Sequence, residues 1–68
     1  MFNRQLFRAA IIKSGYTIKD VAKKIGISEP SMYRKMSGVS DFTRKEISDI
    51  KELLNLTNDE AGSIFFAS

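Results

Sequence analysis

The chain has 68 residues, 43% of them hydrophobic, and a formal net charge of +3, which fits one small domain over residues 1–68 without a catalytic cleft between two domains. It contains neither cysteine nor histidine, so disulfides, the usual zinc sites, thiol catalysis and histidine acid–base chemistry are excluded, and we expect no catalytic residue, metal or cofactor. The longest apolar run, residues 9–12, is far below the ~20 residues that span a bilayer, and no signal peptide is evident.

A first helix is predicted over residues 2–14, with Asn3 as a plausible N-cap. Phe7, Ala10, Ile11 and Ser14 share one face of this helix at i, i+3, i+4 and i+7, with Leu6 beside it. Gly15 fits the position that ends such a helix, and Tyr16 stands where a hydrophobic residue often precedes the next N-cap.

Residues 17–38 form the most strongly patterned stretch. Thr17 and Asp20 have the spacing of a capping box at the start of a helix. One apolar stripe follows, made by Ile18, Val21, Ala22 and Ile25. Gly26 fits a left-handed residue that ends this helix, and Ser28 is expected to cap a second helix over residues 28–37.

The second helix of this stretch is expected to have a buried and an outward side. Met32 and Met36 lie at i and i+4 and are assigned to the core, while Ile27 fills the turn before them and Gly38 closes the unit. Two short helices joined by a tight turn are typical of a helix-turn-helix.

Two more capping boxes follow, one at Thr43 and Glu46 and one at Thr57 and Glu60. They predict a helix over about 44–55 and a short terminal helix. The expected core residues of this half are Phe42, Ile47, Ile50, Leu53, Leu54, Leu56, Ala61, Ile64 and Phe65. No alternating strand pattern competes, so the predicted fold is an all-α compact bundle of about five short helices around a central helix-turn-helix.

The charge is unevenly distributed along the chain. Residues 1–38 hold eight of the eleven basic and two of the eight acidic side chains, for a net +6, whereas residues 39–68 have a net −3. A basic half that contains the helix-turn-helix is the electrostatic pattern expected for a polyanion partner. Lysines that only keep a small domain soluble would give the same bias.

The motif resembles the Cro/lambda-repressor (XRE-type) helix-turn-helix family, and the tail is similar to small phage or prophage regulators of that family. The matching positions of the motif are Gly15-Tyr16-Thr17, Val21-Ala22, Ile25-Gly26-Ile27-Ser28, Ser31-Met32, Arg34-Lys35-Met36 and Gly38. Those of the tail are Phe42-Thr43, Glu46-Ile47, Leu54-Asn55-Leu56-Thr57 and Ile64-Phe65-Phe66. The resemblance implies a five-helix, lambda repressor-like DNA-binding domain that works as a homodimer on an operator in double-stranded DNA, in the cytoplasm of a bacterium or phage-infected cell.

The resemblance also implies site residues. Bases of the major groove would be read by Glu29, Pro30, Ser31 and Arg34. Phosphates would be contacted by Thr17, Lys19, Ser37, Ser40 and Arg44. Arg34 suits the O6/N7 edge of guanine, although a solvated or phosphate-pairing arginine would have the same sequence signature.

Four further side chains are assigned with alternatives. Lys35 is expected to reach a phosphate or to stay solvated. Tyr33 is expected either to lie against the sugar–phosphate backbone or to pack on the first two helices. Ile64 and Phe66 are candidates for a twofold interface, because three bulky residues in a row on a helix cannot all face the core.

Two functions from different classes follow. The first is a sequence-specific DNA-binding transcriptional regulator, a repressor or Cro-like protein, with residues 28–37 in the major groove. The alternative is a protein-interaction modulator, an antirepressor or corepressor, that binds another phage regulator through the same scaffold. It is motivated by Ile18 and Glu29, which stand where the family often has glutamine, and by the apolar tail.

Overall fold

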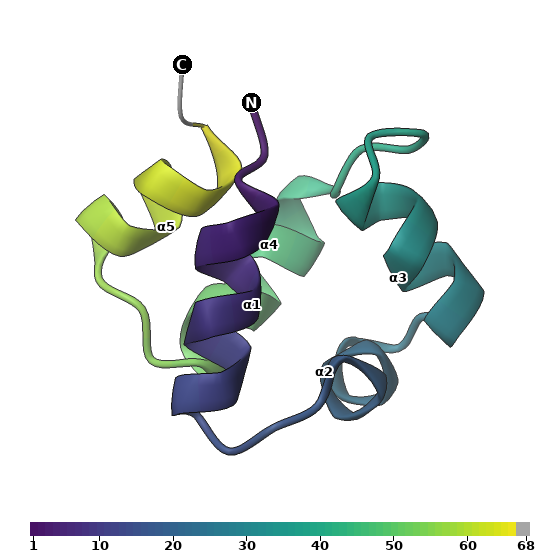
Figure 1. The fold of residues 1–68 in the computed structure, drawn as a ribbon, viewed down its shortest axis with the longest axis horizontal. Coiled ribbons are helices and arrows are strands. Elements are labelled where there is room, and N and C mark those ends of the chain that lie inside the picture. The colour runs from purple at the N-terminus through teal and green to yellow at the C-terminus, as the bar shows by residue number, and fades with distance from the viewer. Residues whose placement is uncertain (67–68) are drawn as a thin grey trace.

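The computed structural model describes residues 1–66, and within them it consists of five α-helices and no strand, so the expected all-α bundle is confirmed. The helices are α1 (Arg4–Lys13), α2 (Ile18–Ile25), α3 (Glu29–Met36), α4 (Arg44–Leu53) and α5 (Asn58–Phe65). Figure 1 shows α1 at the centre, with α5 on one side and the pair α2 and α3 on the other. For the first four helices, the predicted boundaries differ from the observed ones by at most two residues.

Each helix begins at a side chain that satisfies the orphan N–H groups of its first turn. All three predicted capping boxes are formed, at Thr17, Thr43 and Thr57. Asn3 and Ser28 cap the other two helices by accepting from backbone N–H groups at 3.0 and 3.2 Å. The N–H of Thr17 donates to Asp20, and the N–H of Thr57 to Glu60; these bonds lower the pKa of both carboxyl groups below the usual values.

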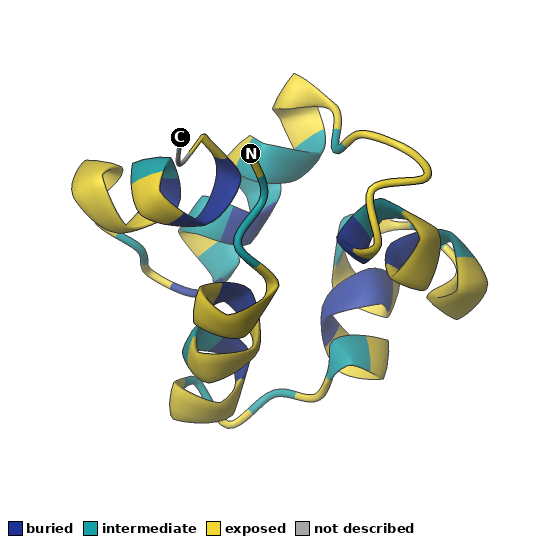
Figure 2. Cartoon of the chain, turned by 45° about the horizontal axis from the view of Figure 1, so that its top comes forward, coloured by how far each residue is buried: buried dark blue, intermediate teal, exposed yellow. Residues whose placement is uncertain are grey.

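One core is shared by all five helices. Its buried apolar residues are Phe7, Ile11, Val21, Ala22, Met32, Met36, Ile50, Leu54, Ala61, Ile64 and Phe65. Figure 2 shows the buried positions of each helix turned toward the others. Phe7 and Phe65 of this core form an aromatic cluster with the partly buried Phe2 and Phe42, with ring centroids 5.1 to 6.1 Å apart. Phe42, which the sequence predicted in the core, is partly buried and packs against it.

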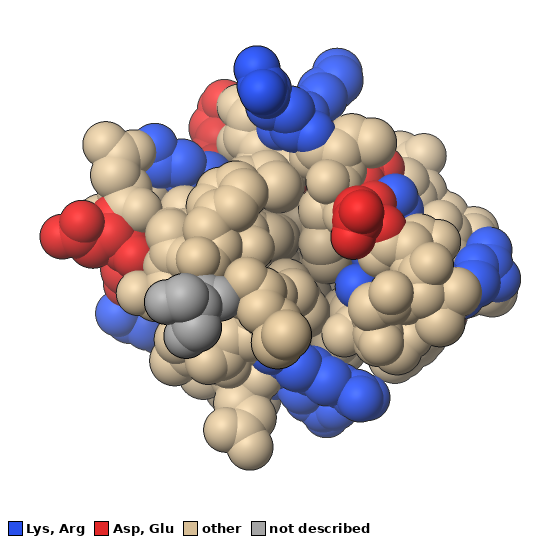
Figure 3. Space-filling model, turned by 90° about the horizontal axis from the view of Figure 1, so that it is seen from above, with Lys and Arg blue, Asp and Glu red and all other residues tan. Residues whose placement is uncertain are grey.

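The two ends of the described chain lie together. The N–H of Asn3 donates to the carbonyl of Ile64 at 2.6 Å, and α1 packs against α5. Figure 3 shows the molecule from this end, where most of the visible Lys and Arg side chains lie toward the rim of the face and a few charged side chains lie closer to its middle.

The structure corrects one of the two residues assigned to a twofold interface. Ile64 is only 3% exposed, because it follows Ala61 by one turn on the buried side of α5. Its side chain is therefore not available to a second subunit. Phe66 is 68% exposed and remains a candidate.

Over residues 1–66, none of the helices has the length and apolar character that crossing a membrane requires.

We predict that Gly26→Ala lowers the free energy of unfolding by ~1–2 kcal/mol, because residue 26 has φ +81° and a left-handed residue with a Cβ is strained. Gly62→Ala is the matched control. A Cβ added at either glycine would have no atom within 4 Å. Because Gly62 is inside α5, Gly62→Ala is expected to raise the free energy of unfolding by ~0.5–1 kcal/mol. Urea unfolding followed by circular dichroism measures both; equal effects at the two positions would contradict the role given to Gly26.

Candidate nucleic-acid interface

The turn between α2 and α3 fixes how α3 leaves the bundle. Gly26 ends α2 in the left-handed conformation, and the N–H of Ile27 donates to the carbonyl of Ala22 at 3.0 Å. Ile27 packs against the core as predicted. Figure 1 shows α2 end-on and α3 running across the view, so the two helices cross steeply.

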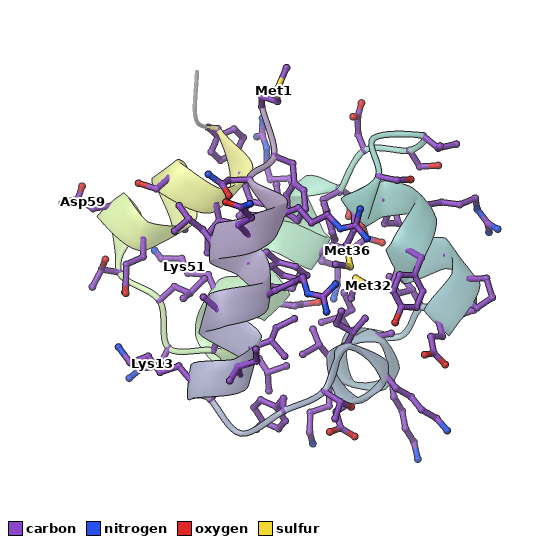
Figure 4. All side chains as sticks on the ribbon, in the orientation of Figure 1. Met1, Lys13, Met32, Met36, Lys51 and Asp59 are labelled. Atoms are coloured by element: carbon purple, nitrogen blue, oxygen red, sulfur yellow. The ribbon has the colours of Figure 1, made fainter. Side chains whose placement is uncertain are left out.

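Two methionines hold α3 by its inner side. Met32 and Met36 are buried, and Figure 4 shows both pointing from α3 toward the middle of the bundle. The remaining side of α3 is therefore turned to solvent along its whole length. These two methionines belong to the core, as the spacing predicted.

The four predicted base-reading residues lie on or beside this outer side. Glu29, Pro30 and Arg34 are exposed, and Ser31 is half-buried. Among the described residues, no ion pair involves Glu29 or Arg34. Both charges are thus available to an external partner.

The start of α2 and the start of α3 open onto one shallow depression of about 290 Å³. Thr17, Lys19, Glu29 and Tyr33 of the predicted set line it. The structure therefore brings together one base-reading residue and three of the residues expected at the DNA backbone. Tyr33 lies beside residues of α1 and α2 here, which agrees with packing on these helices, and it keeps an exposed edge.

Arg8 of α1 lines the same depression and was not among the predicted site residues. It is exposed and in no ion pair among the described residues. Only the packing of α1 against α2 brings it to this place. The one available signal in the sequence was its position on the polar side of the first helix, which Arg4 and Lys13 share.

Lys35 does not belong to the phosphate-contacting set, and here the structure corrects the sequence. Its ammonium group lies 3.0 Å from Glu46 Oε1 and donates to the carbonyl of Asp41 at 3.0 Å. The side chains of Lys35 and Glu46 are only 12% and 14% exposed. Lys35 thus connects the end of α3 to the loop and to the start of α4, with its charge neutralised inside the protein.

The pKa of Glu46 reflects this pairing. Burial alone would raise it, but hydrogen bonds from the N–H of Thr43 and from Lys35, together with the charge of Lys35, hold the pKa below its usual value of 4.5. The carboxylate is therefore ionised near neutral pH, as the ion pair requires.

The other predicted phosphate contacts are in the segment after α3. Ser37 is exposed, and its hydroxyl donates to the carbonyl of Arg34 at 3.1 Å. Ser40 and Arg44 are exposed as well. None of the three lines the depression at Arg8, so the structure separates the predicted backbone contacts into two groups.

In the described part of the chain, no group of three or more His, Cys, Asp or Glu side chains is placed to hold a metal ion. Comparisons with models of protein families, with curated proteins and with solved structures find no match to this chain. The interpretation of the site therefore depends on its residues and their geometry.

We predict a pH-dependent effect of Glu46→Gln. Glutamine keeps a capping acceptor but removes the negative charge, so the variant should be less stable than the wild type at pH 7. Because the folded pKa of Glu46 is lowered, its contribution is complete above the unfolded pKa and is lost as the pH falls through the folded value. Urea unfolding should show a smaller difference in the free energy of unfolding between the wild type and Glu46→Gln at pH 3 than at pH 7.

Asp49→Asn is the control for this experiment. Asp49 pairs with Lys45 at 2.9 Å, but both side chains are more exposed than those of Lys35 and Glu46, and such surface pairs contribute only ~0–1 kcal/mol. A difference for Glu46→Gln that stayed constant between the two pH values would exclude the ion pair as its cause.

Proposed function

We propose that this protein is a sequence-specific DNA-binding transcriptional regulator of the Cro/lambda-repressor-like helix-turn-helix family. It acts by occupying an operator as a homodimer, with α3 in the major groove. The observation that carries the proposal is the outward side of α3, where Glu29 and Arg34 form no ion pair with any residue that the structure describes, next to a depression lined by basic side chains of α1 and α2.

The first support is the side chain chemistry of α3. A helix of this size fits the major groove when its inner side is buried in the protein and its outer side is free. Arg34 is exposed and forms no ion pair within residues 1–66, so its forked guanidinium is available to pair with the O6 and N7 atoms of a guanine. Glu29 in the first turn suits the N4 amino group of a cytosine.

The second support is the charge around the depression. Arg8 and Lys19 stand beside Glu29 there, and their positive charges offset the repulsion that Glu29 would otherwise exert on a phosphate. The N-terminal turn of α2 adds the partial positive charge of a helix start at Thr17. Backbone phosphates of DNA are therefore favoured partners for Arg8, Thr17 and Lys19.

Selection of bound fragments from a random pool of duplex DNA tests the proposal. A dimeric regulator should enrich a site with two related half-sites about one helical turn apart. If no sequence were enriched and no gel shift occurred on any DNA at low salt, DNA binding would be refuted. Co-elution with another regulator protein would then favour the interaction modulator.

Arg34→Ala is expected to weaken binding to the selected site by ~1–3 kcal/mol and to relax the preference at one base position, because a bidentate contact is lost. Fluorescence anisotropy on the selected site and on random DNA measures this. An equal loss on both would show that Arg34 contacts only the backbone.

Arg8→Ala and Lys19→Ala are each expected to weaken binding to all sequences alike. Each should make the slope of log K against log salt shallower by about one unit, since one phosphate contact is lost. Arg4→Ala is the matched control, because it removes the same charge from an exposed position of α1 outside the depression. Slopes that were the same for Arg8→Ala and Arg4→Ala would remove Arg8 from the interface.

A further inference from the structure

A groove lies between α1 and α5, on the other side of α1 from the depression at Arg8 (Figure 1). It consists of two hollows, one of about 380 Å³ between α1 and α5 and one of about 430 Å³ between α1 and the turn that joins α4 to α5. The two hollows are continuous because they share four lining residues, which are Ala10, Lys13, Leu56 and Glu60. We call the whole of it the α1–α5 groove.

One face of α1 forms a wall of this groove over two turns. Leu6, Ala9, Ala10 and Lys13 stand at i, i+3, i+4 and i+7, and all of them line it. Leu6 is 45% exposed, and each of the two alanines carries only a methyl group, so the wall is apolar and leaves room beside it. From Leu6 to Lys13 this wall is ~11 Å long at the rise of an α-helix. The groove is thus elongated along α1.

Charged side chains border the groove. Lys13 stands at the end of α1, and Asp59 and Glu60 belong to the first turn of α5. Figure 4 shows Lys13 and Asp59 projecting on the same side of the molecule. No described residue forms an ion pair with either of these two. One base and two acids give this rim a net charge of −1, although the whole chain has a net charge of +3.

The shape and the apolar wall favour a helix as the occupant. An amphipathic helix places large side chains at i, i+3, i+4 and i+7 into a groove of this kind. Small residues such as Ala9 and Ala10 let two helix axes approach to ~8 Å. The backbone N–H and C=O groups of a helix are bonded to one another, so the middle of a docked helix leaves none of them unpaired against the apolar wall.

The described helices of this chain do not supply such an occupant. Their exposed large apolar side chains are Leu6 and Ile12 on α1 and Tyr33 on α3. Leu6 already lines the groove, and Ile12 follows it by six positions, which puts the two on different faces of α1. No helix within residues 1–66 therefore presents two exposed large apolar side chains on one face. The helix that fills the groove has to come from another protein.

We propose that the α1–α5 groove binds an amphipathic helix of a different protein, whose large apolar side chains enter between α1 and α5 and whose basic side chain pairs with Asp59. The charge of the rim favours a basic helix, because the acids outnumber the base there. The contact is independent of the proposed function, since no residue assigned to bases or phosphates lines the groove. Because α3 lines no part of it, a helix bound there leaves the outer side of α3 open.

Two synthetic peptides of ~16 residues test the contact with the full chain. Both carry leucines at i, i+3, i+4, i+7 and i+11, and they have either lysines or glutamates along both flanks of the leucines. Fluorescence anisotropy at low salt should show that the lysine peptide binds ~5- to 10-fold more tightly than the glutamate peptide. The net charge of +3 would produce the opposite preference, so this result identifies the acidic rim. In NMR spectra of the ¹⁵N-labelled protein, the amide signals of Ala9 and Ser63 should shift and that of Arg34 should not.

Ala9→Phe tests whether the groove itself is filled. Ala9 is exposed, so the added ring enters the groove without disturbing the core, and it should weaken binding of the lysine peptide at least ~10-fold by a steric clash. Ile12→Phe is the matched control, because Ile12 is 74% exposed on α1 and lines neither hollow. It should leave the affinity unchanged, and circular dichroism verifies that both variants are folded.

Asp59→Lys tests the charge of the rim. It should reverse the preference, so that the glutamate peptide binds more tightly. Asp41→Lys is the control, since it changes the net charge by the same amount at an exposed position outside the groove. This control should keep the preference for the lysine peptide.

Three outcomes overturn the proposal. The first is a lysine peptide that does not bind or binds no more tightly than the glutamate peptide, and the second is an unchanged affinity for Ala9→Phe. The third is a shift of the Ala9 and Ser63 signals that depends on the concentration of the protein alone, which would assign the groove to a second copy. Binding at the groove with the expected preference supports the proposal whether or not the protein binds DNA.

Discussion

None of the five helices in residues 1–66 is long enough to be stable alone. The five helices have eight to ten residues each, whereas an isolated helix is marginal in water below ~12–15 residues. Each therefore depends on its N-terminal cap and on the one core that all five share. The core contacts that stabilise the fold therefore also position α3, because α3 keeps its place only while Met32 and Met36 stay buried.

The candidate interface is built on two attachments of α3 that differ in kind. Apolar packing of the methionines fixes the helix along its length, and the ion pair of Lys35 with Glu46 fixes its end against α4. Because both attachments use the inner or terminal side of α3, Glu29 and Arg34 on the outer side are left for a partner. A rigid element with an unpaired outer surface suits recognition of an equally rigid duplex.

Structural features that depend on interactions between residues close in sequence were predicted correctly. The caps at Thr17, Thr43 and Thr57 each bond to a residue three positions on, and Gly26 acts through its own backbone. Such features are readable from spacing, and with the apolar periodicity they predicted the all-α fold and its helices.

The errors in the site arose from interactions between segments. The helical spacing places Lys35 among the polar positions of α3. The loop after α3 brings Glu46 to it, and the local sequence pattern does not predict that pairing. Arg8 joins the depression only through the packing of α1 on α2, and Ile64 is buried because α5 turns toward α1. Helical periodicity identifies which residues of α3 point outward, but it does not identify the partner that these residues bind.

The hydrogen bond between Asn3 and Ile64 joins residues from nearly opposite ends of the domain, and Phe65 packs in the same aromatic cluster as Phe2 and Phe7. During synthesis on the ribosome, α1 therefore emerges long before the residues that cover it. With helices too short to persist alone, the chain gains its core in one step once residue 65 is free of the exit tunnel. A message cut short before α5 would for this reason yield no folded domain, because α1 would lack the residues that cover it.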